Sequence, residues 1–212
     1  MLYDVKYFSD NMKHFAFLLV LMSGILASCT GAPKESAMAK NETIENLMTR
    51  RAIRSYQDRM PEMELVEKVA EAGTYAPTGM GRQSPVIVAV TDKAVRDRLS
   101  SLNARVMGSD KDPFYGAPVV LVVLADRSVP THVYDGALVM GNMLNAAHAL
   151  GLGSCWIHRA KEVFDSEEGK ALLKEWGIEG DYEGIGNCIL GYPAGEYPSP
   201  APRKEGYVRF IK

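Results

Sequence analysis

The feature that most restricts the fold of this chain is an unbroken apolar run at residues 119–125, directly after Pro118. The run reads Val-Val-Leu-Val-Val-Leu-Ala, without the polar alternation of a strand that has one solvated face. A continuous apolar run of this length is typical of a strand buried on both faces. It therefore predicts the centre of a layered sheet with helices packed against it.

Helices and strands are expected to alternate around this central strand. Asn41 is predicted to cap a short helix with an acidic first turn, in which Ile44, Leu47 and Met48 face inward. Further helices are expected at 62–75, 95–106, 134–150 and 172–176, further strands at 86–90 and 186–191, and a last extended piece at 207–211. The pattern predicts one domain of the α+β or α/β class.

One helix start carries a local signal of its own. Asp165 and Glu168 resemble a capping box, in which the first residue accepts a hydrogen bond from the backbone of the third helical position. We therefore expect Asp165 to begin the helix that bears Leu172, Leu173 and Trp176.

The first residues are predicted to be a targeting signal rather than part of the folded domain. Lys13 precedes a short apolar run at 15–25, and Leu26-Ala27-Ser28-Cys29 then resembles a bacterial lipobox. We expect a signal peptide at 1–28 that is cleaved before Cys29, a flexible tether at 29–40 and the functional domain at 41–212. Lipidated Cys29 would be the one membrane contact and would hold the protein on the periplasmic side of the cell envelope. The alternative is a buried N-terminal helix in a cytoplasmic protein.

Composition and motifs exclude several kinds of function. The chain has 24 basic and 26 acidic residues, a net charge of −2, so it lacks the basic surplus of a general nucleic-acid binder. It has no G-x-x-x-x-G-K phosphate loop, no H-E-x-x-H metal helix and no G-x-S-x-G nucleophile elbow. Three cysteines are too few for a disulfide scaffold, and whether Cys155 and Cys188 pair is left open. No metal ligand is assigned.

What remains is a set of features suited to an anion and a planar ligand. Arg50, Arg51 and Arg54 form the densest positive cluster and could clamp a phosphate, although such a run can also be a solvated face. The glycine-rich loop at 76–85 lets backbone N–H groups approach a ligand. The segment 150–157 joins a helix to a strand through tight glycines, and 201–204 returns positive charge near the C-terminus.

In this order, together with Gly116-Ala117-Pro118 and Leu190-Gly191-Tyr192-Pro193, these pieces resemble the FMN-dependent nitroreductase family over 43–209. The resemblance implies an α+β fold with a mixed central β-sheet flanked by helices, and an intertwined homodimer with FMN at the interface. The helix at 134–150, where Ala137 and Gly141 permit close approach, would lie at the dimer core. The piece at 207–211 would cross onto the partner.

The resemblance also implies a role for each part of the site. Arg50 and Arg203 would hold the FMN phosphate, and Arg51 and Ala52 the ribityl region. Arg54 would face the pyrimidine edge, where a cation stabilises the negative charge of the reduced flavin. The loop from Pro77 would come from the partner subunit, and the segment from Cys155 would flank the ring, with Cys155 as a packing residue. The implied cofactor-binding set is Arg50, Arg51, Ala52, Arg54, Pro77, Thr78, Gly79, Met80, Gln83, Cys155, Trp156, Ile157, Arg203 and Lys204.

The chain departs from the family pattern at four positions. Gly81 stands where the family often has asparagine, and Ala52 stands where serine is usual. Ala201 replaces a basic residue, whose place Lys204 could take, and His158 stands where a small residue is common. We expect these changes to affect the properties of the bound flavin and the choice of substrate more than FMN binding itself.

The implied activity is a ping-pong oxidoreductase reaction. NAD(P)H would reduce FMN, and a nitroaromatic, quinone or similar small acceptor would then take the electrons, so no catalytic side chain is assigned. Flavin-dependent dehalogenation or dehydrogenation would use the same scaffold. Two non-enzymatic readings stay open: a flavin- or ligand-binding envelope lipoprotein without turnover, and a structural lipoprotein in which the arginines pair with acidic neighbours.

Overall fold

The computed structural model describes residues 41–212. The predicted signal peptide at 1–28 and tether at 29–40, with Cys29, lie outside the described residues. From Glu42 to Lys212 the chain forms one compact unit. Within 41–212, no helix combines the length and apolarity that crossing a bilayer would require.

The core of the unit is a four-stranded sheet in the order β1-β2-β4-β3. The strands are β1 (Pro85–Val90), β2 (Val119–Asp126), β3 (Gly153–Ile157) and β4 (Tyr182–Gly191). All three pairings between them are antiparallel. The predicted α+β class is confirmed, and β2 lies inside the sheet, as its apolar run predicts.

The parallel component that makes a sheet mixed is small here. Among the described residues it consists of one isolated bridge, between Ala52 and Ser154 on the outer edge of β3. This bridge brings the arginine-rich segment alongside the sheet.

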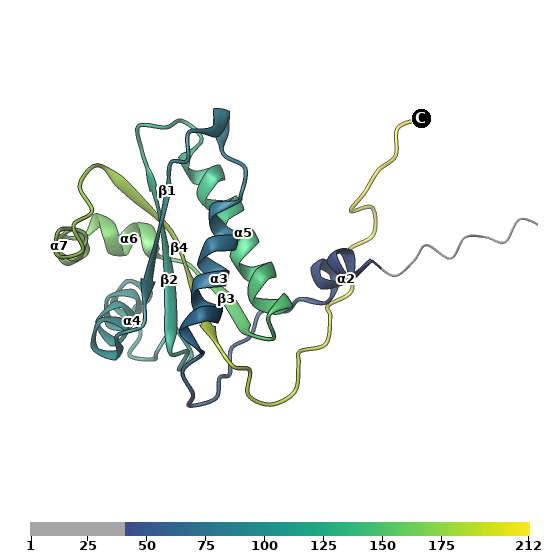
Figure 1. Cartoon of the computed structure of the whole chain (residues 1–212), viewed down its shortest axis with the longest axis horizontal. Coiled ribbons are helices and arrows are strands. Elements are labelled where there is room, and N and C mark those ends of the chain that lie inside the picture. The colour runs from purple at the N-terminus through teal and green to yellow at the C-terminus, as the bar shows by residue number, and fades with distance from the viewer. Residues whose placement is uncertain (1–40) are drawn as a thin grey trace, which may run out of the picture. The chain divides into compact units, whose positions relative to one another are not determined.

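Helices cover both faces of the sheet (Figure 1). The helices α3 (Met63–Thr74) and α5 (His132–Ala149) lie on one face. The helices α4 (Lys93–Met107), α6 (Ala160–Asp165) and α7 (Glu167–Glu175) lie on the other.

Alternate residues of β2 supply both halves of the core. Val119, Leu121 and Val123 pack under α3 and α5, whereas Val120, Val122 and Leu124 pack under α4, α6 and α7. None of these side chains is exposed to solvent, and each stabilises the fold by about 1.5–3 kcal/mol through burial. β2 is therefore the strand that packs against the helices on both faces of the sheet.

The predicted capping box at Asp165 is wrong. Asp165 is the last residue of α6, and its carboxylate pairs with Arg127 and Lys161. The N-cap of α7 is Ser166, whose side chain accepts a hydrogen bond from the backbone N–H of Gly169. The helix ends at Asp165 and a second helix begins at Glu167, so the cap lies one residue later than the sequence motif indicates.

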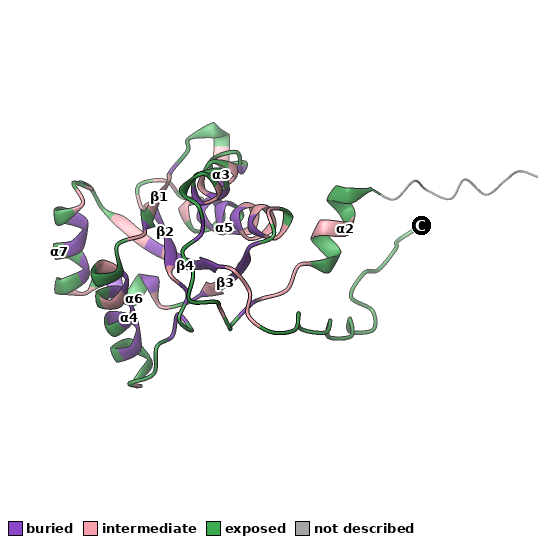
Figure 2. Ribbon diagram, turned by 60° about the horizontal axis from the view of Figure 1, so that its bottom comes forward, coloured by how far each residue is buried: buried purple, intermediate pink, exposed green. Residues whose placement is uncertain are grey.

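The helix α2 (Glu42–Thr49) begins where it is predicted, but its apolar residues do not face the core of this chain. Ile44, Leu47 and Met48 are all exposed, and the helix has no buried residue. Figure 2 shows α2 and the C-terminal segment as exposed parts of the chain. Within one chain, the expectation that these residues face inward is wrong.

The predicted extended piece at 207–211 forms no strand in the described chain. Its residues are exposed, and Ile211 is 95% exposed. An extended segment becomes a strand only when a neighbour accepts its ladder hydrogen bonds, and this segment has no such neighbour within its own described chain.

Candidate functional site

The arginine-rich segment is fixed to the outer edge of β3. The N–H of Ile53 donates to the carbonyl oxygen of Ser154 at 3.0 Å, and the buried Ile53 side chain packs directly over Gly153, where a Cβ would be 2.9 Å from it. Further along, the N–H of Gln57 donates to the carbonyl oxygen of Tyr192 at 2.9 Å. Because the backbone and Ile53 are held, the neighbouring arginines are positioned by the fold.

In the part of the chain that the structure describes, these arginines form no ion pairs with acidic side chains. Among the described residues, no carboxylate pairs with Arg50, Arg51 or Arg54, and Arg51 instead donates to backbone carbonyl oxygens. The Nε of Arg51 is buried without a hydrogen-bond partner. Within residues 41–212 the structure therefore does not support the reading in which the cluster pairs with acidic neighbours, and the guanidinium groups can bind an anion bidentately.

The positive charges of these arginines change the pKa values of two neighbouring groups, Cys155 and His148. Burial raises the pKa of Cys155, and the charges of Arg54 and Arg50 oppose that rise. Burial also lowers the pKa of His148, and Arg50 and Arg51 lower it further. The guanidinium groups thus lie between the end of α5 and β3, where they create a positive region.

His148 connects this region to two other parts of the chain. Its Nε2 lies 3.0 Å from the Oγ1 of Thr49 at the end of α2, and its Nδ1 lies 2.7 Å from the hydroxyl of Tyr197. Asn46 of α2 also donates to the carbonyl oxygen of Asn145 at 3.0 Å. The last turns of α5 therefore hold α2 and part of the C-terminal segment near the arginines.

The two cysteines of the domain are buried and free. Burial raises the pKa of Cys188 to about 12, and burial likewise raises that of Cys155. A thiol is a nucleophile mainly as its thiolate, so neither group is activated. Cys155 packs within the buried core, and the open question of a disulfide is answered, because the two thiols do not pair.

The second predicted part of the site is the loop that contains η1 (Gly79–Gly81). Its shape depends on Asp135 in the first turn of α5, which is only 2% exposed. The carboxylate accepts hydrogen bonds from the N–H of Gly79 at 2.9 Å and from the hydroxyls of Ser84 and Thr131 at 2.9 and 3.1 Å. Burial opposes ionisation of Asp135, but these three bonds outweigh it and lower its pKa. The loop is therefore held by a buried anion.

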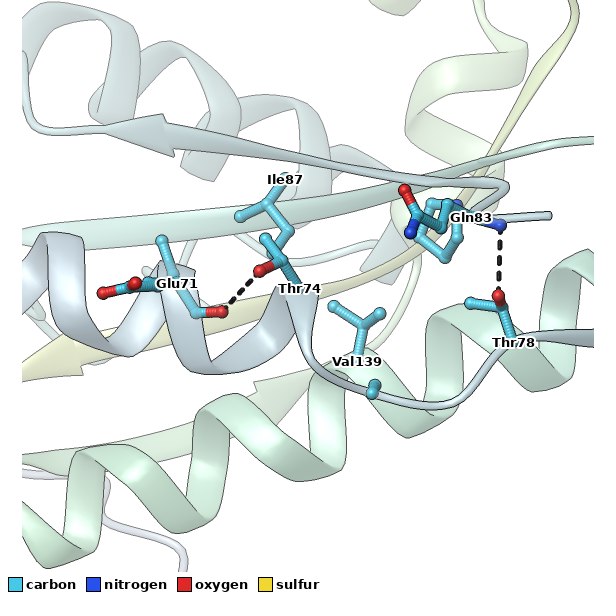
Figure 3. Close-up of a pocket in the computed structure, with 9 residues that line it drawn as sticks. Glu71, Thr74, Thr78, Gln83, Ile87 and Val139 are labelled. Carbon is cyan, nitrogen blue, oxygen red and sulfur yellow. Dashed lines mark hydrogen bonds between the residues drawn. The ribbon is translucent and has the colours of Figure 1, made fainter. Parts of the chain in front are cut away.

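A cavity of about 320 Å³ lies beside this loop, between the end of α3 and β1 (Figure 3). Thr78 and Gln83 line it, and the N–H of Gln83 donates to the Thr78 hydroxyl at 3.0 Å. Ile87 and Val139 form apolar parts of its wall. Two of the predicted cofactor residues thus border a real cavity.

A third region lies at the outer edge of β3, where a cavity of about 390 Å³ is lined by Arg54, Trp156 and Ile157 of the predicted set. The loop after α4 and the corner between β3 and α6 complete it with Lys111, Tyr115 and Arg159. Sequence analysis missed these three residues, because nothing in their local pattern marks them.

Backbone strain is concentrated in these regions. Among the described non-glycine residues, four have a left-handed φ: Met80, Gln83, Tyr115 and Arg159. Two lie in the loop around η1 and two line the cavity at the edge of β3. Strained residues cluster at functional sites, because the surrounding structure must hold them in place for a reason other than stability.

One chain does not bring all the predicted residues together. Asp135, which holds the loop around η1, lies in the first turn of α5, whereas Asn145 and His148 lie in its last turns. At ~1.5 Å per residue, about 15–20 Å of helix separates the two regions. The contacts of Arg203 and Lys204 are local, to Ala201 and Tyr207.

Comparison with known proteins gives a consistent result. The model of the nitroreductase family matches residues 47–192. A Methanothermobacter thermautotrophicus protein, named for NADH dehydrogenase and NAD(P)H nitroreductase, is 29% identical over 58% of this chain. An Archaeoglobus fulgidus protein with the same name is 31% identical over 73% of the chain and 87% of its own length. The match spans 63% of the first of these relatives.

The fold has solved counterparts as well. A crystal structure of a nitroreductase with bound FMN from Bacteroides fragilis superposes with a TM-score of 0.75. The two sequences are 26% identical, and the match covers 82% of this chain and all of the other.

Proposed function

The chain belongs to the nitroreductase family, and on that basis we propose that it is an FMN-dependent oxidoreductase that uses NAD(P)H. The observation that carries the proposal is the cluster of arginines along β3, which has no acidic partner within residues 41–212, in a fold that holds FMN in a solved relative. When bound, FMN accepts a hydride from NAD(P)H and passes electrons to a small acceptor.

The residues at the edge of β3 suit the parts of this cofactor. Arg50, together with Arg203, would hold the phosphate, and Arg51 and Ala52 would hold the ribityl chain. Arg54 would supply a positive charge at the pyrimidine edge, which would favour the reduced, negatively charged cofactor. The unpartnered Nε of Arg51 supports this arrangement, because a buried donor needs an acceptor.

The complete site requires two copies of the chain. The arginine segment and the loop around η1 lie at opposite ends of α5, so we propose that the first comes from one subunit and the second from its partner. This assignment covers Pro77, Thr78, Gly79, Met80 and Gln83.

Exposed apolar residues supply a surface for such a dimer. On the outer side of α5, Tyr134 is 72% and Leu138 48% exposed, and a Cβ added to Gly141 would meet no atom within 4 Å. Further exposed apolar residues lie in α2 and in the C-terminal segment. Large apolar side chains exposed together along one side of a helix are typical of an interaction site. We propose that α5 packs against its counterpart and that the C-terminal segment crosses onto the partner.

The reaction is proposed to be ping-pong, with a nitroaromatic or quinone-type acceptor entering after the oxidised nicotinamide leaves. The chain's own groups bind and orient the reactants and exclude water. Cys155 contributes an apolar wall rather than a nucleophile, since its pKa is raised by burial.

The test is anaerobic reduction of the purified, FMN-loaded protein. We expect NADH or NADPH to bleach the flavin absorbance, and an added nitroaromatic to restore it. The matched variant Arg50→Gln should retain the fold but lose most of its flavin, whereas Arg98→Gln, on the opposite face, should behave like the parent. A protein that binds FMN but is not bleached would refute the redox function and support the alternative of a flavin-binding protein without turnover.

We also propose that the protein is anchored on the periplasmic side of the envelope through lipidated Cys29. The proposal is supported by the sequence Leu26-Ala27-Ser28-Cys29 alone. A Cys29→Ala variant should leave the membrane fraction and lose incorporation of labelled palmitate. Unchanged membrane association of that variant would contradict it.

A further inference from the structure

His148, in the last turn of α5, is hydrogen-bonded to both of the segments that carry predicted phosphate ligands. Its Nε2 lies 3.0 Å from the Oγ1 of Thr49, the residue directly before Arg50. Its Nδ1 lies 2.7 Å from the hydroxyl of Tyr197 in the C-terminal segment, and the two ring centroids are 5.5 Å apart. The proposed function gives this half-buried side chain no role.

These hydrogen bonds define which ring nitrogen carries the proton. The hydroxyl of Thr49 has a single proton and donates it to the carbonyl oxygen of Glu45 at 2.7 Å, so toward His148 the Thr49 oxygen can only accept. The Nε2 of His148 therefore carries a hydrogen. In a neutral imidazole the other nitrogen, Nδ1, is then an acceptor, and it accepts from the Tyr197 hydroxyl.

The surroundings of His148 favour this neutral form. Burial lowers the pKa of His148, and the charges of Arg50 and Arg51 lower it further. Burial raises the pKa of Tyr197, and the same two arginines oppose that rise. Both side chains therefore lie beside the arginine pair, where a further positive charge on the imidazole is disfavoured.

Arg50 and Arg51 belong to a short span that is fixed at both ends. At its start, the Oγ1 of Thr49 is hydrogen-bonded to His148. At its end, the N–H of Ile53 donates to a carbonyl oxygen of β3 at 3.0 Å. A span that is fixed at both ends restricts where its guanidinium groups lie, and this preorganisation lowers the entropic cost of binding an anion.

From this arrangement we propose that His148, as a neutral imidazole with its proton on Nε2, is a positioning residue for the phosphate of FMN. It acts through Thr49 on the adjacent arginines and through Tyr197 on the segment that carries Arg203. The anchored Tyr197 keeps Arg203 within about 20 Å, the reach of the extended chain between them. The inference rests on the proposed function, in which these arginines hold the phosphate.

The test compares FMN with riboflavin, which has the same ring system and ribityl chain but no phosphate. Fluorescence titration of the full chain, freed of flavin, gives the affinity for each. His148→Leu removes both hydrogen bonds and should weaken FMN binding about tenfold, while riboflavin binding changes by less than about twofold. His148→Gln should keep FMN binding within about threefold of the parent, because its amide can donate to Thr49 and accept from Tyr197.

The partner of His148 is tested by a variant that removes one hydroxyl. Tyr197→Phe should weaken FMN binding about threefold, whereas Tyr75→Phe, at an exposed residue that ends α3, should not. Because His148 and Tyr197 act as a pair, the double variant should bind FMN no more weakly than His148→Leu alone. Thermal denaturation checks that His148→Leu is folded, and Tyr197→Phe carries the test if it is not.

The position of the proton is measured directly by nitrogen-15 NMR. In FMN-loaded protein with labelled histidine at pH 7, His148 should give the signals of a neutral ring with its proton on Nε2. The spectrum of His148→Gln, which lacks those signals, identifies them. A charged ring, or a neutral one with its proton on Nδ1, would overturn the inference.

Three binding results would overturn it as well. They are equal losses of FMN and riboflavin affinity in His148→Leu, FMN binding by His148→Gln as weak as by His148→Leu, and additive losses in the double variant. A protein that shows the FMN-specific loss but is not bleached by NAD(P)H would keep the role of His148 and refute the redox function. A bleached protein with equal losses would do the reverse.

Discussion

Replacing Asp135 with asparagine should loosen the loop around η1 and destabilise the fold. The carboxylate accepts three hydrogen bonds, one from the N–H of Gly79 and two from the hydroxyls of Ser84 and Thr131. In Asp135→Asn, the amide oxygen can still accept from Gly79, and the hydroxyls can rotate to accept from the amide nitrogen. The geometry therefore survives, but the bonds lose their charge.

The magnitude follows from that loss. A hydrogen bond to a charged group contributes about 1.5–3 kcal/mol and a neutral one about 0.5–1.5 kcal/mol, so three bonds lose about 3 kcal/mol. Removing a buried charge returns part of this, which leaves a decrease of about 2 kcal/mol in the free energy of unfolding. For a domain of this size, that corresponds to a Tm lower by about 4–8 °C.

The difference in unfolding free energy between the parent and Asp135→Asn should decrease as the pH falls. The pKa of Asp135 in the folded chain lies below its ordinary value of 3.8, so its stabilising effect is complete above that value. As the pH falls through the folded-state pKa, Asp135 of the parent becomes protonated, and the parent loses the stability that this carboxylate contributes. Urea unfolding should therefore give a full difference at pH 7 and pH 5 and a smaller one below pH 4.

The control is Asp110→Asn, which neutralises an exposed carboxylate in the loop after α4. It should change the unfolding free energy by less than about 0.5 kcal/mol. If Asp135→Asn matched this control at pH 7, or if its deficit grew toward pH 3, the carboxylate would not be holding the loop as described.

Three shorter predictions test other parts of the structure. Arg50→Gln should weaken FMN binding at least about tenfold in a fluorescence titration, whereas Arg98→Gln should not; equal effects would exclude a phosphate contact at Arg50. Gly141→Leu should leave the far-ultraviolet circular dichroism unchanged, because its side chain meets open space within one chain, but should shift light scattering from dimer to monomer; an intact dimer would refute packing through α5. Cys155 and Cys188 should resist iodoacetamide in the native protein at pH 8, because burial raises both pKa values, and mass spectrometry showing rapid alkylation of either would contradict their packing.

The elements that sequence analysis predicted well are those with a local signal. The runs at 86–90 and 119–125 and the helix at 134–150 carry their hydrophobic pattern within themselves, and the structure confirms them. The order of the strands could not be read in the same way, because pairing joins residues far apart in the chain. β4, last in sequence, lies between β2 and β3.

The errors have physical causes that the sequence does not reveal. Ile44 and Leu47 have helical spacing, but the pattern does not say whether the apolar side faces its own core or another molecule. The piece at 207–211 lacks a neighbour in its own chain. At Asp165, two N-cap candidates stand next to each other, and the structure uses Ser166.

In the candidate site, too, residues with a local sequence signal were predicted, whereas residues that depend on distant contacts were not. The arginines and the loop from Pro77 were predicted because their residue types suit an anion and a planar ligand. Arg159 was missed because its position depends on a residue distant in the sequence: it is held by Asn103, which lies in α4. Asp135 could have been found, since a carboxylate in a largely apolar helix needs hydrogen-bond donors.

The length of α5 has a consequence for how the protein would behave in solution. With the two parts of each site about 15–20 Å apart on one rigid helix, no flexing of a single chain could close them around a ligand. Assembly and flavin retention would then share one equilibrium, so dilution should release flavin and added flavin should restore the paired state. The tightness of cofactor binding would be a property of protein concentration as much as of any side chain.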